Sequence, residues 1–186
     1  MQSHPLFADL GIPMIFITFP GMVAVLPIVI LVEGLVYRNS LNVKPSRAFS
    51  ASASSNLLST LIGVPVAWAI MLAVELTLYP IDYVARHFDW KLTSPVAEAV
   101  TFILSMAWLP PMGKGHKWLI PIAASLLLVP SFFVSVWIER RICSSLWKGE
   151  EADRVRKAVV RANVMSYCML FVIGVCWLMI SRKAGR

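Results

Sequence analysis

Long uninterrupted apolar runs constrain this chain more than any other feature of its sequence. The clearest extend over residues 12–36, 53–78, 118–138 and 159–180. Each is close to the length of about 20 residues that a helix needs to cross a hydrocarbon core roughly 30 Å thick. Only 15% of the 186 residues are charged, whereas a soluble domain carries about a quarter. The sequence therefore predicts an all-α integral membrane protein, with the lipid bilayer as its first partner.

A fifth apolar stretch, residues 95–112, is harder to place because it is short and ends soon after Pro110-Pro111. If this stretch does not cross, the two basic loops of the chain face one compartment and hold 10 of its 17 Lys and Arg residues. If it crosses, the basic residues divide 8 against 9 between the two sides. Lys and Arg collect on the cytoplasmic side of membranes. The predicted fold is therefore a four-crossing helical bundle with both termini outside, and five crossings are the alternative.

The region between the second and third clear crossings predicts an outer segment of a different kind. Residues 80–92 mix aromatic and charged side chains, which is typical of a helix that lies flat in the membrane interface. We expect the second crossing to stop at Tyr79-Pro80, and residues 95–112 to form a re-entrant or marginal transmembrane segment. The domain organisation follows: 1–79 is a first two-helix unit, 80–117 the outer segment, and 118–186 a second two-helix unit.

The second basic loop is also expected to be partly helical. Glu150 precedes Arg154 by four residues, and Asp153 precedes Lys157 by four. Acid-first pairs at this spacing stabilise a helix. We predict a charged helix that starts near Gly149 and continues into the last crossing.

The two units carry the same polar motif, which predicts a tandem repeat. Asn56 follows Glu33 by 23 residues, and Asn163 follows Glu139 by 24. In each unit a basic loop separates the two, an arginine precedes the asparagine by nine residues, and a serine follows it by three. The arginines are Arg47 and Arg154, and the serines are Ser59 and Ser166. A parallel repeat of two-helix units implies a pseudo-twofold axis along the membrane normal.

These polar residues form the candidate site: Glu33, Asn56, Ser59, Ser135, Glu139, Asn163 and Ser166. Ser135 belongs to it because it lies four residues before Glu139 on the same helix face. One interpretation is structural: each glutamate bonds its asparagine and the nearby loop arginines, which pins a hairpin. The other is functional: the paired acids and amides line a site for a cation or a proton, since acids inside membrane proteins often mark ion pathways.

The sequence offers no catalytic, cofactor or metal site. His4, His87 and His116 all fall outside the predicted crossings, so we expect no haem or His-rich metal site inside the bundle. Ser131 and Ser135 have no histidine or lysine at the same depth to act as a base. The net charge of +7 is explained by cytoplasmic loops, and no basic patch alternates with exposed aromatics as a nucleic-acid surface would. We therefore predict a non-enzymatic protein with no cofactor, metal or nucleic-acid partner.

Two functions are compatible with these features. The first hypothesis is an accessory or assembly subunit that packs against other membrane-protein subunits or against a second copy of itself. Its support is a stripe of small and polar residues on the second crossing and the charged helix of the second basic loop. The stripe comprises Asn56, Ser59, Thr60, Gly63 and Ala67. The alternative is a small cation- or proton-coupled carrier or channel that uses the Glu/Asn pairs. For both, the expected location is the bacterial inner (plasma) membrane, with the basic loops in the cytoplasm.

Overall fold

The computed structural model describes residues 12–87, 108–109 and 119–184, which form long helices apart from two very short strands. The helices are α1 (Met14–Leu41), α2 (Pro45–Leu58), α3 (Val64–His87), α5 (Leu119–Leu146) and α6 (Ala152–Ala184). A five-residue π-helix, η1 (Ser59–Gly63), joins α2 to α3. Four helical segments are long and apolar enough to cross a membrane: Phe19–Leu41, Pro45–Val74, Ile120–Leu146 and Ala152–Lys183. For the described residues, the prediction of an all-α membrane protein is confirmed to the extent that four helices are long and apolar enough to cross a membrane. The alternative of a fifth crossing depends on residues 95–112, which lie almost entirely outside the described residues.

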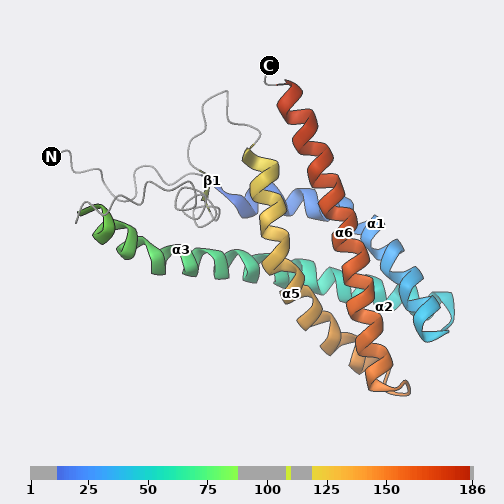
Figure 1. Cartoon of the computed structure of the whole chain (residues 1–186). Helices are drawn as coiled ribbons and strands as arrows, with labels where there is room; N and C mark the ends of the chain where they lie inside the picture. The colour runs from blue at the N-terminus through green and yellow to red at the C-terminus, as the bar shows by residue number, and fades with distance from the viewer. Residues whose placement is uncertain (1–11, 88–107, 110–118, 185–186) are drawn as a thin grey trace.

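Two helical hairpins make up the described part of the bundle. α1 packs along α2, α5 packs along α6, and α6 also contacts α1. The α1–α2 turn and the α5–α6 turn lie at the same end of the molecule (Figure 1). At the opposite end, strand β1 (Ile12–Pro13) pairs antiparallel with strand β2 (Trp108–Leu109). This pairing places Trp108 and Leu109 beside the start of α1, whereas the rest of residues 88–118 lies outside the described residues.

The hydrophobic core at the turn end combines small residues with two large aromatic rings. Tyr37 and Trp147 are almost fully buried, and their ring centroids lie 5.0 Å apart at 76°. Alanines on α2 and α6 let the helices approach closely around them. The cluster comprises Tyr37, Leu41, Ala48, Ala51, Cys143, Trp147, Val155, Ala158, Val159 and Ala162.

The helix ends differ from the prediction at several points. The expected stop at Tyr79-Pro80 is wrong, because α3 continues to His87; membrane helices tolerate proline when the freed backbone groups find other partners. Residues 80–87 are therefore helical and continuous with α3. Their assignment to an outer interfacial segment stays a prediction, and residues 88–92 lie outside the described residues. In Figure 1 the far end of α3 extends away from α5 and α6.

The basic loops are much shorter than predicted. α2 begins at Pro45 rather than near residue 53, and α5 continues past residue 138 to Leu146. Pro45 stands at the first turn of its helix, where its missing N–H costs nothing. Asn42 follows α1 with φ 55°, the left-handed geometry that often ends a helix. Gly149 lies in the second turn, and the charged helix starts at Ala152.

Gly34 allows the close contact between α1 and α2. A Cβ atom added at Gly34 would lie 2.6 Å from Cε1 of Phe49 and closer still to Cδ1, whereas one added at Gly21 would meet nothing within 4 Å. We expect Gly34→Ala to lower the free energy of unfolding by about 1–3 kcal/mol, as overpacking does. Gly21→Ala should not lower it, because alanine forms helices better than glycine. Unfolding in mixed micelles with increasing SDS compares the two; equal stability would contradict the contact.

Candidate functional site

The candidate site is a buried polar cluster where the two hairpins meet. Glu33 is 0% exposed and Glu139 is 1% exposed. All seven predicted residues are buried: Glu33, Asn56, Ser59, Ser135, Glu139, Asn163 and Ser166. Six of them share one hydrogen-bond network through the two carboxyl groups. Ser135 stands beside it, with its hydroxyl 2.9 Å from that of Tyr167.

Within each hairpin, an asparagine amide donates to the glutamate of the preceding helix. Asn56 Nδ2 lies 2.6 Å from Glu33 Oε2, and Asn163 Nδ2 lies 2.8 Å from Glu139 Oε2. The same nitrogens also donate to the carbonyls of Ser52 at 3.0 Å and Val159 at 3.1 Å, one turn earlier. These second bonds hold each amide in the orientation that presents its N–H group to the acid.

Between the hairpins, each serine donates a hydrogen bond to the glutamate of the other hairpin. Ser166 Oγ of α6 donates to Glu33 Oε1 at 2.6 Å, and Ser59 Oγ of η1 donates to Glu139 Oε1 at 2.9 Å. Each glutamate therefore accepts from its own hairpin through one oxygen and from the other hairpin through its second oxygen. Ser59 begins the π-helix, a distortion that often occurs at functional positions in helices.

Arginines at the turn end repeat this reciprocal arrangement. Arg47 Nη2 donates to the carbonyl of Leu146 at 3.4 Å, and Arg154 Nη2 donates to the carbonyl of Ser40 at 3.2 Å. Both acceptors lie in the last turns of helices, where carbonyls lack intrahelical partners. The structural interpretation expected these arginines to bond the glutamates. In the described residues they instead cap the opposite hairpin.

Among the described residues, the donors bonded to the carboxyl pair are all neutral. Asn56, Asn163, Ser59 and Ser166 supply amides and hydroxyls, and Tyr37 adds a phenol 3.3 Å from Glu139 Oε2. The two carboxyl groups belong to one buried network, because Asn56 donates to Glu33 and Ser59, three residues later, donates to Glu139. Two bare carboxylates side by side away from water repel strongly. The arrangement can therefore hold a proton, or accept a cation in its place.

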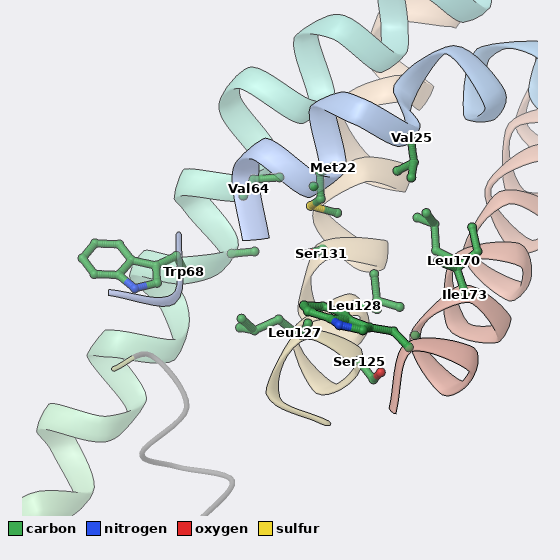
Figure 2. A pocket seen from close by; sticks show the side chains of 15 residues that line it. Met22, Val25, Val64, Trp68, Ser125, Leu127, Leu128, Ser131, Leu170 and Ile173 are labelled. Atoms are coloured by element: carbon green, nitrogen blue, oxygen red, sulfur yellow. The ribbon is translucent and has the colours of Figure 1, made fainter. Parts of the chain in front are cut away.

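Access to the pair differs on its two sides. Toward the turns, the aromatic and alanine cluster around Tyr37 and Trp147 covers it. On the opposite side, a void of about 30 Å³ touches Glu139, Ser59 and Ser135. Beyond this void lies an apolar cavity of about 210 Å³ (Figure 2).

Sequence reasoning missed Tyr37 as a member of the network. Tyr37 follows Glu33 by four residues, so the sequence already indicated that the two share one helix face. The bond from Tyr37 to Glu139 could not be predicted from the sequence, because it joins different hairpins. Among the described residues, no group of three or more His, Cys, Asp or Glu side chains is placed to hold a metal ion. Comparisons with protein-family models, curated proteins and solved structures found no match.

Proposed function

We propose that this chain is a small multi-pass membrane carrier or channel, coupled to protons or another small cation, whose site is the Glu33–Glu139 pair. The observation that supports it most is the meeting of two buried carboxyl groups in one network of neutral donors. Acids inside membrane proteins are costly to bury and commonly serve proton or ion movement. A proton is the favoured ion, because two buried carboxyl groups in one network without a cationic partner are stabilised when one of them is protonated.

One-sided access also favours a carrier over an open channel. The void of about 30 Å³ beside Glu139 can hold one water molecule. On the covered side, the buried cluster around Tyr37 and Trp147 packs against the pair. A site open toward one face and closed toward the other is what one state of an alternating-access carrier requires. A change to the other state would then break the bonds that Ser59 and Ser166 make to the glutamates of the opposite hairpin.

The accessory or assembly subunit is the second candidate. It is favoured by the complete pairing of both glutamate side chains, which suits a clasp between hairpins, and by the end of α3 that extends from the bundle (Figure 1). Leu76 on this part of α3 is 65% exposed, and another membrane-protein subunit or a second copy of this chain could cover it. Lipid would cover this side chain equally well, so its exposure does not require a partner protein. The carrier therefore remains our first proposal.

We also propose that the two hairpins are a tandem repeat related by a pseudo-twofold axis along the membrane normal. The reciprocal Asn–Glu, Ser–Glu and Arg–carbonyl bonds support it, since each bond in one half has its counterpart in the other. The end of the molecule that holds the two turns, together with Arg47 of α2 and Arg154 of α6, would face the cytoplasm of a bacterial inner (plasma) membrane, following the preference of basic residues for that side.

The test is proton flux in proteoliposomes that contain the purified protein and an internal pH-sensitive dye. An imposed pH gradient or membrane potential should drive flux through the wild type. Glu33→Gln and Glu139→Gln should each reduce it at least tenfold, because the amide keeps the size of the side chain but cannot take up and release a proton. Glu151→Gln, an exposed acid in the second turn, is the matched control and should leave flux unchanged.

The same variants separate the two candidates. A subunit would tolerate both substitutions at the buried acids with a modest loss of stability and would keep a stoichiometric partner on extraction in mild detergent. Equal flux in the wild type and both glutamine variants, from folded protein, would contradict the carrier.

A further inference from the structure

An apolar cavity lies on the side of the carboxyl pair away from the turns. Figure 2 shows Met22 and Val25 of α1, Leu128 of α5, and Leu170 and Ile173 of α6 around it. Its volume is about 210 Å³. An engineered apolar cavity of about 150 Å³ binds benzene. This cavity is therefore large enough for one aromatic ring with a short chain attached.

The cavity continues into the void beside Glu139. Met22, Val25, Val64 and Leu170 belong to the walls of both spaces. The far wall of the smaller one is polar and includes Glu139, Asn56, Ser59, Ser135 and Tyr167. Its volume of about 30 Å³ exceeds the roughly 10–15 Å³ that a cavity needs to hold one water molecule, so it has room for a single ammonium group. A molecule seated in the cavity can therefore place one small polar group against the acid.

The charge of the residues that line the two spaces determines whether the bound polar group is a cation or an anion. Among the described residues that line the two spaces, Glu139 is the sole residue with a formal charge, and no lysine or arginine is present. The hydroxyls of Ser59 and Tyr167 are already engaged with Glu139 and Ser135. A buried acid without a cationic partner favours a positively charged group.

We propose that this cavity binds a small lipophilic amine as its ammonium ion, with the apolar body among α1, α5 and α6 and the ammonium group at Glu139. The inference rests on the proposed function, because such an amine would be the substrate that exchanges with the proton of the carboxyl pair. Amine and proton then compete for one site, and binding of the amine releases a proton from the pair.

The test compares two probes of equal size on wild-type protein in lipid nanodiscs at neutral pH. 2-Phenylethylamine is cationic, and 2-phenylethanol is its neutral counterpart. Titration calorimetry should show the amine binding at least tenfold more tightly than the alcohol. The observed heat of amine binding should also vary with the ionisation enthalpy of the buffer, which reports the release of a proton. Glu139→Gln should bring the two affinities within about twofold of each other.

A pair of tryptophan substitutions on α1 tests the location without changing any acid. Val25 lines both spaces, whereas Val23 is 46% exposed on the outside of the same helix. Val25→Trp should fill the junction and weaken amine binding at least tenfold. Val23→Trp should leave it unchanged.

The outcomes separate this inference from the proposed function. Equal affinity for the two probes in the wild type would overturn the amine site and show a purely apolar cavity, such as one that holds a lipid chain. Absence of binding, alongside proton flux that depends on Glu33 and Glu139, would overturn the amine site but leave the carrier. Selective amine binding without flux would support the site and contradict transport.

Discussion

Glu139→Leu is expected to lower the free energy of unfolding by about 3 kcal/mol. Asn163, Ser59 and Tyr37 lose their bond to Glu139 in this variant. Ser59 can still donate to the carbonyl of Asn56 at 3.2 Å, whereas one N–H group of Asn163 and the hydroxyl of Tyr37 lose their acceptor. A buried donor left without a partner costs about 1–3 kcal/mol, although hydrogen bonds measured inside membrane proteins average only about 0.6 kcal/mol. The larger range applies here because Asn163 and Tyr37 are both 0% exposed, so neither can turn to water.

The measurement is unfolding of the purified protein in mixed micelles, followed by helical circular dichroism. Glu151→Leu, at an exposed acid, should change the free energy of unfolding by less than about 0.5 kcal/mol. The triple variant Glu139→Leu/Ser59→Ala/Asn163→Leu should recover part of the loss, since replacing donors and acceptor together by apolar groups is often nearly neutral. If the single leucine variant were as stable as the wild type, the network would not hold the hairpins together.

The helical crossings could be predicted because hydropathy and length report directly on the membrane. The helix ends could not, since polar turns of a helix such as Pro45–Ser52 and Arg140–Leu146 carry no apolar signal. Their helical state depends on contacts with the opposite hairpin, for example the bond from Arg47 to Leu146. Continuation of α3 through Pro80 was hidden for a related reason, because local propensity alone gives proline a strong tendency to end a helix.

Spacing along the sequence predicted which residues form the candidate site, but it did not predict all of their hydrogen-bond partners. The near-equal separations from Glu33 to Asn56 and from Glu139 to Asn163 indicated the bonds within each hairpin. Nothing in the chain indicated that Ser166 would bond Glu33 and Ser59 would bond Glu139. Those bonds join residues 133 and 80 positions apart. They depend on how the hairpins pack, and this packing is what turns two separate acids into one pair.

Asn163→Asp should have the largest effect of any isosteric change in the site. The substitution places a carboxylate oxygen where Nδ2 now lies, 2.8 Å from Glu139 Oε2. A donor becomes an acceptor that faces another acceptor, and a third carboxyl joins a pair without a cationic partner. The other side-chain oxygen, Asn163 Oδ1, has no hydrogen-bond partner among the described residues, so no donor compensates there. We expect a loss of at least about 3 kcal/mol, the cost typical of an unpaired buried charge.

The double variant Asn163→Asp/Glu139→Gln tests the cause of this loss. It exchanges donor and acceptor across the same contact and returns the number of carboxyl groups to two, so it should recover at least half of the lost stability. Asn39→Asp, at an exposed position of α1, is the control for the substitution itself and should be nearly neutral. A double variant no more stable than Asn163→Asp alone would mean that shape at this contact matters more than the direction of the hydrogen bond. Recovery would instead identify a polarised Asn–Glu contact as the element that each hairpin contributes to the pair.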